Sequence, residues 1–354
     1  MKWKERSSTF CLEPQDMQII AQCKMSLTEM VRHDHPNKNI PPLWSVLSYV
    51  MLQSTSHANI WYRYRALREM ASNTKLWYYT QYIPKSNGGA RRISVPTHAI
   101  RTQQKYILAK ILKGLPVSDH AYAYREGRSI QDCAKPHESQ DVLIHLDLTD
   151  FFGSISENMV FLTFYRETGY SRSLCRFLAK MCCLRGSLPQ GTVTSPMLSN
   201  IVFYRCDEDL ARLAARYGMN YTRYSDDLYF SGNSALDVGE VLKKITRILL
   251  YYGFRINEKK TKIRRRQHRQ TVLGLTVNDH IQVSRKYRRD LLQELYYLDR
   301  FGENCKGAVA CGDYLKYMQQ LQGKLAYVLH ADPENVKMRE AHSKLIRRIH
   351  QYSE

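Results

Sequence analysis

Apolar residues recur every three or four positions over several stretches of the chain, which is the spacing of a helix with one buried face. This spacing predicts helices over about 97–112, 157–168, 172–184, 194–217 and 238–252. The last is the best patterned, because Asp237 can cap its start and Gly253 can end it. Residues 1–75 and 284–354 are also predicted to be mostly helical.

Runs rich in β-branched and aromatic residues separate these helices and predict strands. They lie at about 76–84, 90–95, 142–147, 254–257 and 271–277, with a strand-turn-strand hairpin over 221–230. The first two strands flank a loop that contains Gly88 and Gly89, which is typical of a hairpin. The order of strand, helices, hairpin, helix and strands predicts an α+β fold, in which an antiparallel sheet packs on helices.

The chain is strongly basic. Its 354 residues include 53 Lys and Arg against 33 Asp and Glu, a formal net charge of +20. Such an excess favours a polyanionic partner, nucleic acid before an anionic membrane surface. No apolar stretch approaches the ~18 residues that span a bilayer. The basic N-terminus is not followed by the apolar segment of a secretory signal. We therefore expect a cytoplasmic protein with no membrane partner.

Two adjacent carboxylates, Asp226 and Asp227, lie within the apolar and aromatic run of the predicted hairpin. Two like charges held side by side are costly unless a cation neutralises them, and hard divalent cations prefer oxygen ligands. An isolated Asp-Asp pair is more often a solvated turn, so a metal site needs a third acid. Asp147 is the candidate, because it ends a predicted buried strand where an unpaired carboxylate is costly.

The order of three motifs extends this interpretation. Asp147 is followed by the loop Leu188-Pro189-Gln190-Gly191 before a helix, and then by the box Tyr224-Ser225-Asp226-Asp227. In this order the chain resembles the reverse transcriptases, with Ser225 at a position where bacterial members commonly have Ala. The resemblance implies that Asp147, Asp226 and Asp227 hold two Mg²⁺ ions for nucleotidyl transfer.

The same resemblance implies a right-hand polymerase fold of fingers, palm and helical thumb. It places an N-terminal helical region at 1–75, fingers at 76–141, a palm with interleaved fingers elements at 142–278, and a basic thumb at 279–354.

Further residues lie where the family contacts the incoming dNTP. They are Lys85, Arg92, Asp150, Phe152 and Gln190. Phe152 is expected to be the aromatic gate against the ribose 2′-hydroxyl, and Arg92 a bidentate clamp on the triphosphate. Gln190 is expected to contact the nucleotide and to help align the template. Asp150 could equally be a helix N-cap, and Lys85 a solvated surface lysine.

Lys260 matches the lysine that the family places near the pyrophosphate as a general acid. The sequence leaves its register open by one residue, because Lys259 directly precedes it.

The stretch from 255 to 289 is the most basic part of the chain, with 12 Lys and Arg against 2 Asp and Glu. A solvated surface is the simple interpretation, but this bias beside a polymerase palm favours phosphate contacts. The expected nucleic-acid-binding residues are Arg264, Arg265, Arg266, Arg285, Lys286, Arg288 and Arg289.

Two segments resemble the bacterial retron reverse transcriptases in particular. The segment from Ser129 to His137 is similar to a retron insertion, with Cys133 where the retron motif has Asn. Val272-Leu273-Gly274 stands in place of the retron Val-Thr-Gly box. This resemblance implies a cognate structured non-coding RNA as template and primer. It also implies a branched RNA–DNA product (msDNA) and a separate effector protein in antiphage defence.

Two alternatives stay open at this point. One is another bacterial defence, abortive-infection or group II intron-like reverse transcriptase. The other is a catalytically idle RNA-binding scaffold that restrains an effector, against which the three intact aspartates argue.

Overall fold

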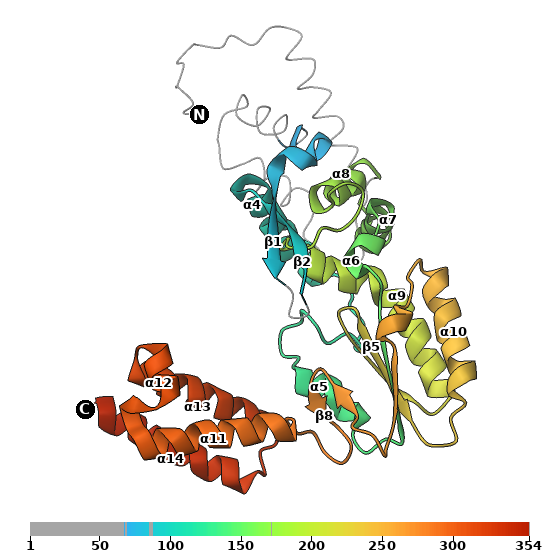
Figure 1. Cartoon of the computed structure of the whole chain (residues 1–354). Helices are drawn as coiled ribbons and strands as arrows, with labels where there is room; N and C mark the ends of the chain where they lie inside the picture. Colours follow the sequence, from blue (N-terminus) through green and yellow to red (C-terminus); the bar gives the residue numbers. More distant parts are fainter. Residues whose placement is uncertain (1–66, 68, 85–87, 171, 354) are drawn as a thin grey trace, which may run out of the picture. The chain divides into compact units, whose positions relative to one another are not determined.

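The computed structural model describes residues 67, 69–84, 88–170 and 172–353 (Figure 1). The predicted N-terminal helical region, 1–75, therefore lies almost wholly outside the described residues, as does Lys85. The chain divides into two compact units. The first unit is Met1–Ser118 with Asp150–Tyr204, and the second is Asp119–Thr149 with Arg205–Glu354.

The first unit contains a two-stranded antiparallel sheet and several helices. Its strands are β1 (Tyr78–Pro84) and β2 (Ala90–Pro96), and its longer helices are α4 (His98–Lys110), α7 (Glu157–Thr168) and α8 (Arg172–Cys182). The side chain of Gln104 on α4 is buried and donates to the Met181 carbonyl at 3.0 Å and to the Tyr78 hydroxyl at 2.7 Å. This amide therefore ties α4 to α8 and to the start of β1. These three helices confirm the predicted ones to within two residues at each end.

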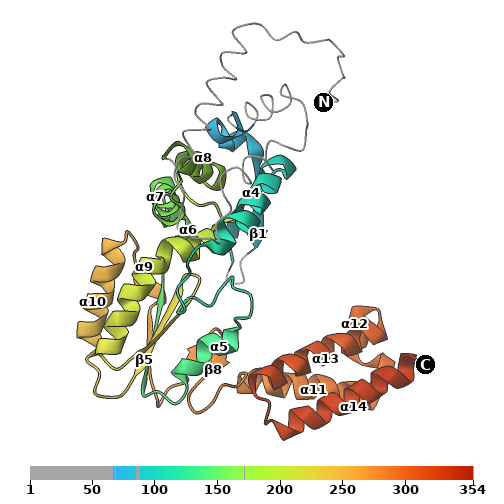
Figure 2. The same ribbon diagram turned by 180° about the vertical axis from the view of Figure 1, so that it is seen from behind.

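The second unit is built on a four-stranded antiparallel sheet in the order β4-β5-β3-β6. The strands are β3 (Val142–Asp147), β4 (Asn220–Tyr224), β5 (Asp227–Gly232) and β6 (Lys262–Arg265). Helix α10 (Val238–Tyr251) lies beside this sheet in both views and buries Val241, Ile245 and Leu249 (Figures 1 and 2). The long helix α9 (Ser195–Arg216) leads into β4. A sheet packed with helices confirms the predicted α+β class.

Two strand predictions were wrong. Residues 254–257 do not form a strand: only Ile256 makes a single bridge, with Leu148, and the edge strand is Lys262–Arg265 instead. Edge strands are often charged, so the apolar pattern that predicts interior strands does not detect this one.

The single strand predicted at 271–277 is a tight hairpin of β7 (Thr271–Val272) and β8 (Leu275–Thr276). Its two turn residues, Leu273 and Gly274, both have positive φ, 50° and 87°. Positive φ at both central positions is the conformation that closes a two-residue hairpin.

The C-terminal part of the second unit is helical, as predicted. It contains α11 (Arg285–Phe301), α12 (Lys306–Cys311), α13 (Tyr314–Ala331) and α14 (Val336–Ser353), with α11, α13 and α14 side by side in both views (Figure 2). Their apolar faces share a core that includes Leu291, Leu321 and Leu325. Across the described helices, none is both long enough and apolar enough to cross a membrane.

Candidate active site

The three predicted acids meet at one end of the sheet in the second unit. Asp147 is the last residue of β3 and Asp227 the first of β5, and the two are direct cross-strand partners. Asp226 lies in the turn between β4 and β5, where its carbonyl accepts from the Leu148 amide at 3.0 Å. Direct cross-strand partners have Cβ atoms about 5 Å apart. The sheet register therefore brings together the carboxylates that the sequence places 80 residues apart.

Two of the acids already contact a nitrogen donor. Lys260 Nζ donates to Asp147 Oδ2 at 2.8 Å, and this contact raises the pKa of Lys260. His145 Nε2 lies 2.6 Å from Asp227 Oδ1. The His145 ring stacks on Tyr229, with centroids 4.7 Å apart and planes within 9°. Lys260 rather than Lys259 therefore makes the contact with the acids.

The environment of Asp226 disfavours its charged form. Burial raises its pKa first, and the neighbouring charges of Asp227 and Asp147 raise it further. Losing solvent and facing like charges both disfavour ionisation. The site therefore has a surplus of negative charge that an added cation would relieve.

The donor set of this site fits a hard divalent metal. It offers carboxylate oxygens, the ligands that magnesium prefers. As they stand, no three His, Cys, Asp or Glu side chains within 69–353 are grouped closely enough to hold a metal ion. Asp147, Asp226 and Asp227 are the side chains that would hold one. The ion would compete with Lys260 for the Asp147 carboxylate.

A buried ion pair supports the turn that carries Asp226. Arg223 on β4 and Asp207 on α9 are both fully buried, and they form two bonds, Nε to Oδ1 at 2.8 Å and Nη2 to Oδ2 at 2.7 Å. Arg223 Nη1 also donates to the Ser225 carbonyl at 3.1 Å, and Tyr221 donates to Asp207. Burial opposes the charge of Arg223, but Asp207 outweighs it and raises the pKa of the guanidinium.

Sequence reasoning missed this pair and also missed His145. Nothing in the sequence links Asp207 to Arg223, because their contact depends on how α9 packs on the sheet. His145 could have been found: it is two residues before Asp147 on the same strand, so both side chains lie on one face.

The segment that resembles the retron insertion packs behind the same hairpin. His137 is fully buried, with Nδ1 2.7 Å from Ser231 Oγ on β5 and Nε2 2.8 Å from Thr222 Oγ1 on β4. Cys133, on the short helix α5 (Ile130–Ala134), places its Sγ 3.3 Å from the same Thr222 hydroxyl. Burial lowers the pKa of His137 to about 3, so the ring is neutral at pH 7.

In the first unit, the loop of Gln190 joins the strand of Arg92. The Ser94 amide donates to the Gln190 carbonyl at 2.8 Å. Gly191 has a φ of 107°, and a Cβ there would lie 2.4 Å from Ile93 Cγ2, so only glycine allows this close approach. Arg92 is exposed on β2 beside this junction. Two of the predicted dNTP-binding residues are therefore neighbours.

Phe152 and Asp150 lie at the short helix α6 (Phe151–Ser154) of the same unit. Phe151 is buried against Phe203, whereas Phe152 is only half-buried. Asp150 occupies the N-cap position of α6 but with a left-handed φ of 44°, and its side chain makes no capping bond. The N-cap alternative for its side chain is therefore not supported.

The predicted nucleic-acid-binding residues separate into two groups, on β6 with the residue after it and at the start of α11. Arg264 and Arg265 are exposed on β6, while Arg266 lies near Asp141 at 3.9 Å and Asp279 at 3.7 Å. On α11, Arg288 donates to Gln282 at 2.7 Å, while Arg285, Lys286 and Arg289 are exposed. Arg266 and Arg288 thus have contacts within the protein, as does Arg289, whose Nε lies 3.9 Å from Asp290.

Known proteins are similar to this chain over most of its length. The family model described as reverse transcriptase (RNA-dependent DNA polymerase) matches residues 83–277, more than half of the chain. The retron Mx65 reverse transcriptase of Myxococcus xanthus is 34% identical over 73% of this chain and 62% of its own length. The retron Ec73 reverse transcriptase of Escherichia coli is 32% identical over 71% of this chain and 82% of its own length.

The chain thus spans less than two thirds of the Myxococcus enzyme. A solved telomerase from Candida tropicalis aligns with a TM-score of 0.41 and 15% identity, over 58% of this chain and 55% of that one. That likeness is too low to add to the assignment. The sequence relatives and the matched family model suffice: the chain belongs to the reverse transcriptase family, as one of its retron-type members.

Proposed function

We propose that this protein is an RNA-directed DNA polymerase of retron type, which copies a cognate structured non-coding RNA into DNA with two magnesium ions. The observation that carries the proposal is the register of the sheet, which makes Asp147 and Asp227 cross-strand partners beside Asp226. Three oxygen-donor side chains lie at one end of the sheet and offer ligands for the metal ions that nucleotidyl transfer uses. Binding of a cation would relieve the like charges that raise the pKa of Asp226.

In this reaction a terminal hydroxyl attacks the α-phosphorus of a dNTP, and pyrophosphate leaves. Magnesium, when bound, would activate the hydroxyl and stabilise the charge on the leaving pyrophosphate. Asp147, Asp226 and Asp227 would hold the ions. Lys260, which bonds to Asp147, would donate a proton to the leaving group once that bond is released. Arg92 would bind the triphosphate, and Gln190 and Asp150 would contact the nucleotide.

The subdomains of the family's polymerase fold extend the proposal to the rest of the chain. Residues 76–141 would form the fingers, 142–278 the palm and 279–354 an RNA-binding thumb. The seven basic residues named above, on β6, beside it and on α11, would bind the RNA or its product.

The biological part of the proposal is drawn from the same relatives. Retron Mx65 and retron Ec73 give their names to reverse transcriptases similar to this chain. We propose that this enzyme too produces a branched RNA–DNA hybrid (msDNA) in the cytoplasm of a bacterium. The hybrid would act in antiphage defence together with a separate effector protein.

The test is extension by purified protein with its flanking non-coding RNA, MgCl₂ and dNTPs. Asp226→Asn with Asp227→Asn should abolish synthesis. A matched control neutralises two exposed acids outside the site, Asp279→Asn with Glu334→Gln, whose side chains are 75% and 93% exposed. Synthesis that survives in the first variant, or that fails equally in the second, would contradict the assignment.

A further inference from the structure

A tyrosine hydroxyl lies against the turn that carries Asp226. Tyr124 Oη and Ser225 Oγ are 3.0 Å apart, and both residues have a left-handed backbone with a φ of 61°. Residues other than glycine rarely adopt this conformation, and for a bulky residue such as tyrosine it is strained. Such strain persists only where the surrounding structure holds it, and it is concentrated at functional sites. The contact between these two residues is therefore a candidate for a functional one.

The main chain brings the two residues together within the second unit. The Arg223 amide donates to the His120 carbonyl at 2.7 Å, and the Tyr122 amide donates to the Arg223 carbonyl at 2.9 Å. This short pairing is parallel and lies along β4, whose other neighbour is β5. Tyr124 and Ser225 each follow the pairing by two residues. The two side chains therefore meet at the end of the sheet where the acids lie.

Three contacts hold the turn between β4 and β5. The Ser225 carbonyl accepts from Arg223 Nη1 at 3.1 Å, and the Asp226 carbonyl accepts from the Leu148 amide at 3.0 Å. Both contacts use main-chain oxygens of the turn, so an alanine at position 225 would keep them. The contact with Tyr124 is different, because it needs the serine hydroxyl. It is therefore the contact through which a side chain outside the hairpin can act on the turn.

The direction of the hydrogen bonds follows from the chemistry of the carboxylate. Burial has the largest effect on the pKa of Asp226 and raises it, whereas a side-chain hydrogen bond from Ser225 lowers it. An ionised carboxylate can only accept, so Ser225 donates its one hydroxyl proton to Asp226. The Tyr124 hydroxyl must then donate to Ser225 Oγ. Two hydrogen bonds thus connect Tyr124 to the carboxylate of Asp226, and each polarises the other.

The exposure of the two residues separates this contact from ordinary core packing. Ser225 is 6% exposed, whereas Tyr124 is 47% exposed. The Tyr124 ring therefore gains little from burial of apolar surface, although fixing its hydroxyl on one atom removes rotamer freedom. This combination favours a role for the hydroxyl in positioning the turn over a role for the ring in the stability of the core.

We propose that Tyr124 is a positioning residue for nucleotidyl transfer, whose hydroxyl holds Ser225 and through it keeps the Asp226 carboxylate in the orientation that binds a metal ion. The inference rests on the proposed polymerase function for the reaction that it serves. Tyr124 acts only through Ser225. Without its hydroxyl, the carboxylate is still present but adopts the binding orientation less often.

The first measurement is a double-mutant cycle on single-turnover extension of an RNA–DNA primer–template. The variants are Tyr124→Phe, Ser225→Ala and the two combined. Each single variant should lower the rate constant at saturating dNTP by about 2- to 12-fold, as expected for one hydrogen bond. The half-saturating dNTP concentration should stay within about twofold, because binding of the nucleotide is not changed. The combined variant should be no slower than the slower single one, since both changes remove the same connection. Effects that multiply would contradict the proposal.

A matched control removes the same two hydroxyls elsewhere on the second unit. Tyr251→Phe with Ser234→Ala changes exposed residues at the end of α10 and in the loop after β5, at the opposite end of that strand from Asp227. The control should keep the native rate constant to within about twofold. Thermal melting should show that all the variants are folded. A rate constant in Tyr124→Phe that equals that of the control would overturn the proposal.

The second measurement needs no polymerase activity. Mn²⁺ replaces magnesium because it is visible by EPR, and its dissociation constant is measured with the full chain in the absence of nucleic acid and dNTP. Tyr124→Phe and Ser225→Ala should each raise this constant by about 2- to 12-fold, and the combined variant should raise it no further. Asp226→Asn serves as the reference for loss of the ligand. An unchanged constant in Tyr124→Phe, or binding that Asp226→Asn does not weaken, would reject the proposal.

The outcomes separate this inference from the proposed function. If the native protein makes no DNA, but its Mn²⁺ affinity depends on Tyr124 and Ser225 as one unit, the positioning of Asp226 is retained and the polymerase is rejected. If Tyr124→Phe makes DNA with the native rate constant and binds Mn²⁺ as the native protein does, the polymerase is retained and the positioning role is rejected.

Discussion

At the scale of single residues, the site combines side chains that were predicted from the sequence with side chains that were not. Asp147, Asp226 and Asp227 follow from motif order, and the register of β3 and β5 brings them together. The buried pair of Asp207 and Arg223 does not follow, because its contact depends on how α9 packs on the sheet. His145 was missed, although its place two residues before Asp147 on one strand puts both side chains on the same face. The residues missed from the sequence are therefore those that hold the acids in place, and not the acids themselves.

Lys260, rather than Lys259, contacts Asp147, which favours Lys260 as the proposed general acid and yields a test. Lys260→Ala should lower kcat by about 10²-fold, because a general acid typically contributes that much or more. Lys259→Ala is the matched control and should leave kcat within about twofold, since Lys259 makes no contact with the acids. Single-turnover extension of primer–template measures both. Equal losses in the two variants would remove Lys260 from its proposed role.

Phe152 gives a second test at this scale. Its ring is half-buried on α6 while Phe151 packs into the core, so Phe152→Val should remove the gate without disturbing the fold. Discrimination for dNTP over NTP, measured as the ratio of kcat/KM values, should fall by about 10- to 200-fold, the usual range for one side-chain volume. Phe151→Leu, a buried change, should destabilise the protein and leave that ratio in place. An unchanged ratio in Phe152→Val would contradict the gate.

At the scale of elements, the hairpin of β4 and β5 is held from behind by the segment that contains Cys133 and His137. Both residues reach Thr222, and His137 also reaches Ser231, so one segment contacts both strands of the hairpin that carries Asp226 and Asp227. The sequence identified this segment by resemblance but gave no reason for its His. The reason is that a neutral imidazole can bond to a hydroxyl at each nitrogen.

This arrangement predicts a specific dependence of stability on pH. The pKa of His137 falls from 6.5 to about 3 on folding, so between those values the unfolded chain binds a proton that the folded protein does not. Stability should therefore be complete above pH 6.5 and decline as pH falls, by up to about 1.4 kcal/mol per pH unit from this group.

Urea unfolding at pH 7.5 and 5.5 measures this dependence. His137→Gln should be less stable at pH 7.5 but should lose less stability on acidification than the native protein. The exposed His350→Gln should keep the native dependence. A native dependence in His137→Gln would assign the effect to other groups.

The predicted elements were right where an apolar face repeats regularly along a helix. They were wrong at an exposed, charged strand and at a tight turn. Helices such as α7 and α10 bury one regular face, so their spacing located them. The strand of Lys262 to Arg265 is exposed along its whole length, so no apolar pattern marks it. The turn at Leu273 and Gly274 splits another strand, because positive φ at a leucine is not visible in the sequence.

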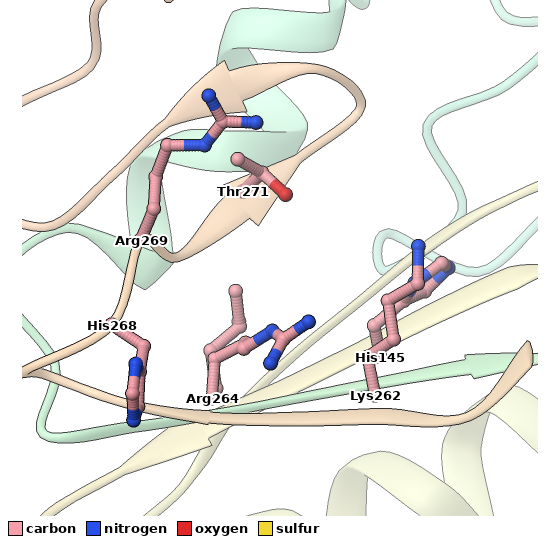
Figure 3. A pocket seen from close by; sticks show the side chains of 7 residues that line it. His145, Lys262, Arg264, His268, Arg269 and Thr271 are labelled. Atoms are coloured by element: carbon pink, nitrogen blue, oxygen red, sulfur yellow. The ribbon is translucent and has the colours of Figure 1, made fainter.

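At the scale of the whole molecule, the charge of +20 is distributed unevenly along the chain. The stretch 255–289 alone carries 12 Lys and Arg against 2 Asp and Glu, and it lies within the second unit, with the acids. Basic composition predicted a polyanionic partner before any element was known. It could not show that Lys262, Arg264 and Arg269 line one pocket, because these side chains converge only once β6 and the β7–β8 hairpin are in place (Figure 3).

This charge predicts strongly salt-dependent binding of nucleic acid by the full chain. Affinity for the cognate RNA should fall by about 10³-fold or more between roughly 50 and 200 mM salt, as for proteins with six or more phosphate contacts. Filter binding or fluorescence anisotropy gives the slope. A slope close to that of one or two contacts would mean that most of the basic residues are only solvated.

The bond between Lys260 and Asp147 has a consequence for metal affinity. A divalent ion that binds Asp147 must compete with an ammonium group tethered to the same protein. Its apparent dissociation constant is the intrinsic one divided by the fraction of molecules in which Lys260 has left the carboxylate. Removing the lysine would therefore tighten metal binding while it slows turnover, so a single side chain couples the two properties in opposite directions.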